Sequence, residues 1–241
     1  MAGRIQMAGA VALLAAMAAP VAAQDGGWQI VLQPYLMVPA MTGSAAVKGF
    51  DADVDVGRKD VVKNLNIGFL GYVEVTNGRL GFAVDTNYMD LDATPDSARI
   101  SANSSQLAVQ PMLFYRVAQW FDLMLGARYN KISLKLESDL EAVDGLKRSK
   151  DWMDPIAGFR FQGPLGGATT FSLLANIGGF GLGSDLALQV KPMLSFGVGS
   201  GISIDAGYQL AYMDYESGSG RDRFAYDVLT HGPLLGVTFR F

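Results

Sequence analysis

The chain has 241 residues, a formal net charge of -4, 50% hydrophobic residues and 17% charged residues. It contains no cysteine, which excludes disulfides and zinc–thiolate sites, and its mild acidity excludes the basic surface that nucleic-acid binding requires.

The first predicted element is an apolar segment at the N-terminus. A single cation, Arg4, precedes an apolar block over residues 7–19, and small residues follow it up to Ala23. This order is typical of a secretory signal peptide, and the block is too short for a transmembrane helix. We therefore expect a signal peptide over residues 1–23 and a single β-barrel domain over residues 24–241. Removing Arg4 with the signal changes the net charge from -4 to -5.

The remaining sequence alternates between apolar and small or polar residues. This period of two residues is typical of a β-strand with one apolar face. Pro34 in the first of these segments predicts weak pairing or a bulge, and Asn77-Gly78 is a strong hairpin signal. The pattern predicts ten strands, over residues 28–38, 61–76, 80–90, 106–117, 121–136, 151–162, 169–182, 185–199, 202–215 and 223–241.

The connections between these segments alternate in length. Short turns are expected at 77–78, 118–119, 163–167 and 200–201. The other connections are expected to be loops at 39–60, 91–101, 137–150 and 216–222, with a short exception at 183–184. Bacterial outer-membrane barrels have short periplasmic turns and longer extracellular loops, whereas a periplasmic sandwich would not alternate. We predict an all-β, antiparallel, up-and-down transmembrane barrel of about ten strands, with eight or twelve as alternatives, in the outer membrane of a Gram-negative bacterium.

The parity of each strand separates a lipid face from an interior face. The interior set contains five acids and five bases, and these are the candidate lumen-lining residues: Glu74, Asp85, Arg116, Asp122, Arg128, Asp154, Arg160, Lys191, Asp205 and Arg240. Balanced charge favours a salt-bridged interior that fills a narrow barrel, because a selective pore usually carries rings of one sign. A narrow passive channel remains the alternative.

Aromatic residues gather at the expected strand ends, as the two interfacial belts of a membrane barrel require. One belt is expected from Trp28, Tyr115, Trp120, Phe121, Phe161 and Phe241, and the other from Tyr88, Tyr129, Trp152 and Tyr212. The last segment should pair with the first. Arg240 should then join an acidic layer that includes Glu74 and Asp205.

The sequence shows no convincing catalytic constellation. The single histidine, His231, has the parity of the lipid face, although a catalytic base must reach its substrate proton. Asp51, Asp53 and Asp55 lack the full spacing of a known calcium motif. We therefore expect no enzyme activity, no cofactor and no metal. Two alternatives stay open: a hydrolase acting on lipid or peptide at the extracellular rim, and a surface-interaction protein acting through residues 39–60 and 137–150.

Three segments, residues 151–161, 178–185 and 232–241, resemble a widespread group of Gram-negative outer-membrane β-barrel proteins. The resemblance implies a porin-like or OmpA/OmpW-like barrel. It also implies insertion by the barrel-assembly machinery, which reads a C-terminal aromatic signature, here Phe239 and Phe241. The partners it implies are this machinery, periplasmic chaperones, outer-membrane lipid and lipopolysaccharide, with no nucleic acid.

Overall fold

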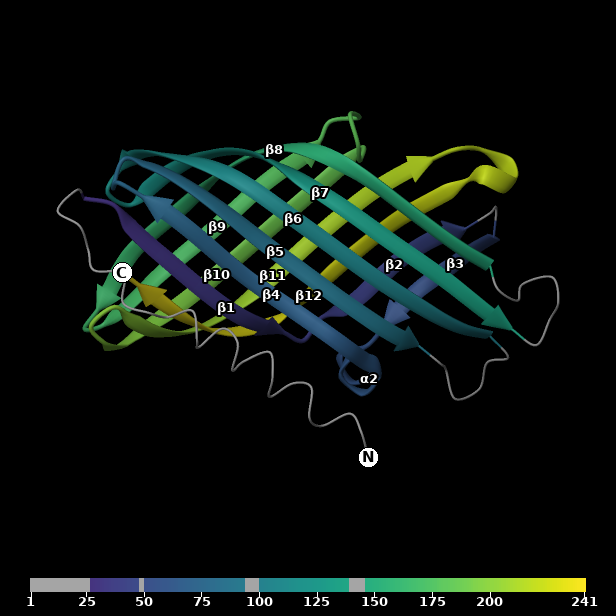
Figure 1. The fold of residues 1–241 in the computed structure, drawn as a ribbon, viewed down its shortest axis with the longest axis horizontal. Helices are drawn as coiled ribbons and strands as arrows, with labels where there is room; N and C mark the ends of the chain where they lie inside the picture. The colour runs from purple at the N-terminus through teal and green to yellow at the C-terminus, as the bar shows by residue number, and fades with distance from the viewer. Residues whose placement is uncertain (1–26, 48–49, 94–99, 139–145) are drawn as a thin grey trace.

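A computed structural model describes residues 27–47, 50–93, 100–138 and 146–241, and these form one closed antiparallel barrel (Figure 1). The signal peptide expected over residues 1–23 lies outside the described residues. Within the described residues, ten strands close the wall, which confirms the predicted fold class and strand number. They are β1 (Gln29–Met37), β4 (Leu65–Thr76), β5 (Leu80–Ala93), β6 (Ile100–Ala118), β7 (Phe121–Ser138), β8 (Leu146–Gly166), β9 (Thr169–Gly179), β10 (Leu186–Gly199), β11 (Ile202–Ser217) and β12 (Phe224–Arg240).

The wall is apolar outside because the strands keep the period of two seen in the sequence. Large hydrophobic side chains are exposed on many strands, including Leu36, Phe69, Val73, Phe82, Leu113, Leu123, Leu125, Met153, Phe159, Ile177, Val190, Ile204, Leu210 and Leu235. Their neighbours along each strand point inward and are mostly buried. In the described chain, no helix is long and apolar enough to cross a membrane.

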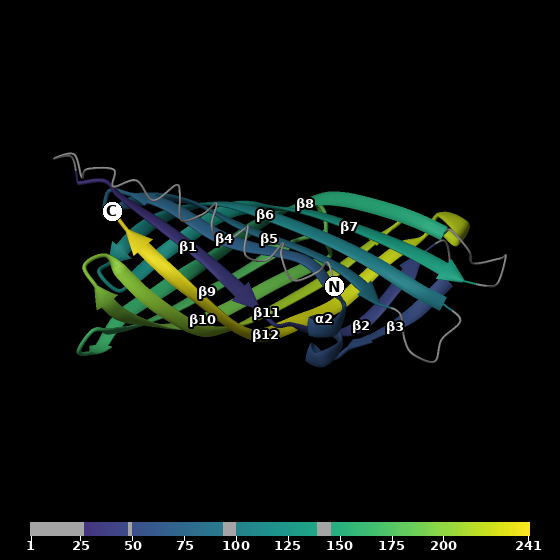
Figure 2. The same cartoon turned by 60° about the horizontal axis from the view of Figure 1, so that its bottom comes forward.

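The barrel closes where the first strand meets the last, as predicted, and Figure 2 shows β1 and β12 side by side. The register runs from Val31 opposite Arg240 to Met37 opposite Leu234. The Ile30 amide donates to the Phe241 carbonyl at 3.1 Å, and the Phe241 amide donates back at 3.0 Å. Pro34 pairs with Gly71 of β4 but is missing from the β12 register, in agreement with the predicted weak pairing.

The prediction that residues 39–60 form a loop was wrong. They contain β2 (Ala40–Val47), β3 (Phe50–Val56) and the start of the short helix α2 (Arg58–Asn64). β2 pairs with the first half of β12, from His231 opposite Ala40 to Phe224 opposite Val47, and so continues the line of β1. Glycine and aspartate disfavour strands locally, but pairing along a long neighbouring strand outweighs that preference.

Helix α2 is an insertion in the second strand of the wall. Extending the β1–β4 register puts Pro39 opposite Asn66, and extending the β2–β3 register puts Ala40 opposite Gly57. Residues 58–65 are therefore eight extra residues between two halves of one strand. Figures 1 and 2 show α2 projecting from the wall between β4 and the β2–β3 hairpin. Among the described residues, β3 pairs with β2 alone.

The predicted loop at 137–150 is also shorter than expected. β7 runs to Ser138 and β8 begins at Leu146, so much of the segment 137–150 is wall, and residues 139–145 lie outside the described residues. Similarly, β5 extends to Ala93 and β6 begins at Ile100. Charged residues in these segments interrupt the apolar alternation from which strands were predicted. The strands form nevertheless, because backbone pairing does not depend on the side-chain charge.

The interior holds two apolar clusters. The first occupies the end away from the short turns and contains Met41, Val61, Leu91, Ile132, Trp152, Tyr215, Phe224, Tyr226 and Val228. The second lies nearer the short turns and contains Tyr35, Tyr72, Ala83, Met112, Phe114, Met124, Ile156, Leu174 and Leu234. Trp152 is 7% exposed and stacks on Tyr215 with ring centroids 3.8 Å apart. Its predicted place in an aromatic belt was wrong, because its parity turns it inward.

Deleting residues 58–65 should leave a barrel that folds, because Gly57 would then join Asn66 in one continuous register. Loss of the buried Val61 side chain should lower stability by roughly 1.5–3 kcal/mol. Folding can be followed by the mobility of unheated protein on SDS gels, and stability by urea unfolding.

The matched control deletes residues 58–64, which leaves one residue too many and demands a bulge or a flipped half-strand. This variant should fold less well than the eight-residue deletion. If both deletions abolish folding alike, α2 is an essential part of the wall rather than an insertion.

Candidate functional site

The candidate site is the barrel interior, and its layer nearest the short turns is built around Arg160. The guanidinium of Arg160 lies between two carboxylates, with Nη1 2.5 Å from Glu74 and Nη2 2.7 Å from Asp122. Arg116 contacts the same Asp122 at 2.8 Å, and Arg160 also lies 4.3 Å above the Phe114 ring. Opposite charge and hydrogen bonding offset the cost of burying these ions. The structure thus brings four of the ten candidate residues into one network.

A second group on the same side surrounds Asp205, which is fully buried. Gln33 donates to its carboxylate at 2.8 Å, and Thr238 donates at 2.5 Å. Arg240 is exposed and donates to Ser203 at 3.2 Å. The expected acidic layer around Arg240 was wrong for the described residues, because neutral donors satisfy Asp205 and Arg160 satisfies Glu74. A residue at the strand end can turn its long side chain to water instead.

A polar layer crosses the middle of the barrel. Lys191 donates to Asp85 at 2.7 Å, and the Tyr35 hydroxyl donates to the same carboxylate at 2.7 Å. Beside them lies Arg128, which is buried but donates to amide oxygens rather than to carboxylates. Its three acceptors are Gln110 at 2.7 Å, Asn176 at 2.7 Å and Gln189 at 3.1 Å. These amides share the inward parity of the candidate residues, but parity could not reveal that they share one guanidinium.

The tenth candidate, Asp154, holds the turn between β9 and β10 inside the barrel mouth. Ser184 donates to Asp154 from its backbone amide at 2.6 Å and from its hydroxyl at 2.9 Å. Trp152 Nε1 donates to Ser184 at 2.8 Å. The turn begins at Gly179 and Phe180, which have φ values of +90° and +55°, and brings the buried Ser184 to Asp154. This explains why the connection at 183–184 is the exception to the long loops, a role for Ser184 that the sequence pattern missed.

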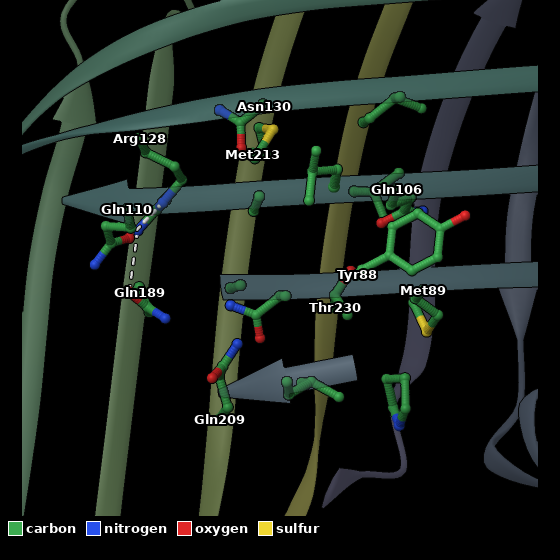
Figure 3. Close-up of a pocket in the computed structure, with 18 of the residues that line it drawn as sticks. Tyr88, Met89, Gln106, Gln110, Arg128, Asn130, Gln189, Gln209, Met213 and Thr230 are labelled. Carbon is green, nitrogen blue, oxygen red and sulfur yellow. Dashed lines mark hydrogen bonds between the residues drawn. The ribbon is translucent and has the colours of Figure 1, made fainter. Parts of the chain in front are cut away.

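Two cavities remain between these layers. The outer cavity, of about 130 Å³, lies between the apolar cluster of Trp152 and the layer containing Arg128 (Figure 3). The inner cavity, of about 220 Å³, opens near the short turns and is lined by Glu74, Arg160 and Lys191. The two cavities share no lining residue. The polar layer of Lys191, Asp85, Tyr35 and Arg128 therefore separates them.

The single histidine lies outside this interior. Its Nδ1 is 2.5 Å from the Tyr208 hydroxyl and 3.4 Å from Nη2 of Arg58, which also donates to Tyr208 at 2.8 Å. Tyr208 has the outward parity of Ile204 and Leu210, so this cluster ties helix α2 to the outer wall. Among the described residues, no three His, Asp or Glu side chains are arranged to hold a metal ion.

An exposed ion cluster lies at the end of the barrel away from the short turns. Arg223 contacts Glu216 at 2.9 Å and Asp51 at 2.6 Å, which links the β11–β12 connection to β3. Hydrogen bonding from Arg223 lowers the pKa of Glu216 below its ordinary value. The contribution of this ion pair to folding stability is present above the usual glutamate pKa. It disappears as the pH falls through the lowered pKa of Glu216. Asp51 is thus part of an ion pair with Arg223.

Replacing Arg160 by Met should strongly destabilise the barrel, because it leaves two buried carboxylates facing each other without their shared cation. The expected loss is about 3–5 kcal/mol, measured by urea unfolding in detergent. The double variant Glu74→Gln/Arg160→Met should recover part of this loss, since Asp122 keeps Arg116. Equal stability of Arg160→Met and the exposed control Arg223→Gln would contradict a role for the interior network.

No family model matches the sequence, and no curated protein matches it. Solved structures with a similar course of the chain share little sequence. The translocator domain of autotransporter NalP from Neisseria meningitidis is 14% identical, with a TM-score of 0.47 and coverage of 98% of this chain and 96% of that one. The outer-membrane protease OmpT from Escherichia coli is 7% identical, with a TM-score of 0.48 and coverage of 92% and 99%. Ail, the attachment invasion locus protein of Yersinia pestis, is 15% identical, with a TM-score of 0.43 and coverage of 89% and 99%.

These similarities are too low to indicate an activity. The structure of the barrel wall, in contrast, indicates a membrane protein. A closed antiparallel sheet with an apolar outer surface and paired charges inside can satisfy every backbone group within lipid. The chain therefore has the architecture of an integral membrane β-barrel, the class to which outer-membrane proteins belong.

Proposed function

We propose that this protein is a structural outer-membrane barrel whose interior does not conduct in the state described. The observation that carries the proposal is the polar layer between the two cavities. Lys191 and Asp85 face each other across the interior from β10 and β5, and Tyr35 donates to the same carboxylate. Both charged side chains are at least 95% buried. Separating them would leave uncompensated charges in a low-dielectric interior.

The distribution of interior charge supports the same proposal. A conducting pore needs sites that an ion can enter and leave, usually lined by groups of one sign or by free oxygens. Here the carboxylates of Glu74, Asp85 and Asp122 are each bound by a cation of the wall. The amide oxygens beside Arg128 are likewise occupied. A narrow passive channel would require this layer to open.

We further propose that the protein is not an enzyme. The partners found for His231 are a phenol and a guanidinium on the outer wall, and neither is an activated nucleophile. Within the described residues, this cluster is better suited to holding α2 against β11 and β12. Turnover of a peptide or phospholipid by the purified barrel that His231→Ala abolishes would contradict this proposal.

The surface-interaction alternative is weaker than the sequence alone indicated. Most of residues 39–60 form strands β2 and β3, and only residues 139–145 of the segment 137–150 fall between described strands. No contact in the described chain favours a particular partner for them.

In planar bilayers the reconstituted protein should show no single-channel steps, because the polar layer separates its two cavities. The triple variant Tyr35→Ala/Asp85→Ala/Lys191→Ala should conduct, since it removes both ions together with the Tyr35 ring beside them. Arg223→Ala, which alters only the exposed ion cluster, should show no single-channel steps. Steps from the unmodified protein at any voltage would overturn the proposal.

We also propose that Phe241 and Phe239 form the assembly signal. Phe241 closes the seam through its backbone bonds with Ile30, so its side chain can be tested separately. Phe241→Ala should lower the folded fraction in cells several-fold while the purified chain still refolds in detergent. Phe241→Tyr should assemble normally. If Phe241→Ala assembles as well as the parent, the aromatic ring carries no signal.

A further inference from the structure

The outer cavity has the composition of a small-molecule site. Much of its lining is apolar, including the six side chains of Met37, Leu70, Met89, Ile132, Met213 and Val228. Ligand sites combine such a lining with a few polar groups that fix orientation. Three of the six are methionines, which adapt readily to differently shaped apolar ligands. Figure 3 shows Met89 and Met213 among the residues around the pocket.

Two buried oxygens at this cavity lack a partner. Within the described chain, Asn130 Oδ1 and Gln209 Oε1 accept no hydrogen bond, and both residues line the cavity. Asn130 is 2% exposed and Gln209 is 6% exposed. A buried acceptor without a donor costs about 1–3 kcal/mol. These two oxygens therefore favour any occupant that brings an O–H or N–H group.

The orientation of Asn130 is set by its neighbour. Its amide nitrogen donates to Asp154 at 2.8 Å, and an ionised carboxylate can only accept. The oxygen of Asn130 is thus left for the cavity. In contrast, the oxygens of Gln110 and Gln189 at the same cavity already accept from Arg128. The buried atoms that lack a partner at this cavity are acceptors, so the missing complement is a donor.

Charge narrows the ligand class further. Arg128 lines the cavity, is buried, and has amide oxygens rather than a carboxylate as its direct partners. Its positive charge disfavours a protonated amine in the same low-dielectric space. A carboxylate ligand would place its acceptor oxygens next to the acceptor oxygens of Asn130 and Gln209, and neither side could donate a hydrogen bond. The cavity therefore favours a neutral molecule.

The volume of the outer cavity limits the size of the ligand. The cavity measures about 130 Å³, and an engineered apolar cavity of about 150 Å³ is known to bind benzene. From these observations we propose that the outer cavity is a binding site for a neutral, single-ring-sized apolar molecule with one hydroxyl or neutral amine donor. The site is independent of conduction, since it lies on one side of the polar layer.

The test uses phenol as probe and methionine methyl groups as reporters. Protein labelled with ¹³C at its methionine methyls is titrated with phenol in detergent micelles and observed by NMR. The signals of Met89 and Met213 should shift and saturate. Met153, which is 59% exposed on the outer wall, reports partition of phenol into the micelle and should change little and without saturation. Toluene, which has no donor, should bind about tenfold more weakly than phenol.

Two variants separate binding from folding. Gln209→Leu removes one free acceptor and should weaken phenol about tenfold while leaving toluene unchanged. Ala211→Phe fills the cavity from the same strand and should abolish both titrations. Gel mobility of the unheated proteins confirms that each variant is folded.

Saturable shifts of Met89 and Met213 that Ala211→Phe removes would support the proposal. Shifts that follow Met153 without saturation would overturn it, and the cavity would then hold water only. Binding of benzoate in place of phenol would also overturn it, because Arg128 rather than the free acceptors would select the ligand.

Discussion

The structure depends on one constraint, which is that no backbone donor or acceptor can be left open inside a lipid bilayer. The seam between β1 and β12 meets this constraint by joining the first and last strands of the wall. Its two hydrogen bonds between Ile30 and Phe241 carry the pairing to the end of the chain. Once the sheet is closed, its apolar outer face needs no protein partner, and the exposed leucines and phenylalanines become a membrane surface.

Closure also decides what the interior must do. A ten-stranded wall encloses a space narrow enough for side chains from opposite strands to meet. Arg160 of β8 therefore reaches Glu74 of β4, and Lys191 of β10 reaches Asp85 of β5. These pairs join strands that are not neighbours in the sheet, so they brace the barrel across its width. The two cavities are the spaces that this bracing leaves, and their different linings give them different chemistry.

The one helical interruption among the described wall strands lies in the second strand. Helix α2 interrupts the line between β3 and β4, but Val61 packs into the interior cluster and Arg58 binds Tyr208 outside. The interruption is therefore anchored on both faces of the wall. A complete insertion of eight residues preserves the parity of the strand on either side, which is why the wall can accommodate it.

The sequence by itself determined the architecture. Alternation of apolar and polar residues is a local property, and it defined the barrel, the ten strands and the inward parity of residues such as Asp85 and Asp205. It failed at residues 39–60, where glycine and aspartate concealed a hairpin that exists because β12 is long enough to pair with it. It also failed for Trp152, which belongs to the interior cluster.

Only the tertiary structure decided which interior residues meet. Parity assigns a side chain to the inside but carries no information about the distance across a barrel, since that depends on register and tilt. Arg240 was expected to pair with acids and instead donates to Ser203, while Ser184, which the alternation pattern did not single out, binds Asp154. Only the tertiary structure likewise shows that the side-chain oxygens of Asn130 and Gln209 lack a donor. They depend on where the neighbouring donors lie, and long-range contacts set those positions.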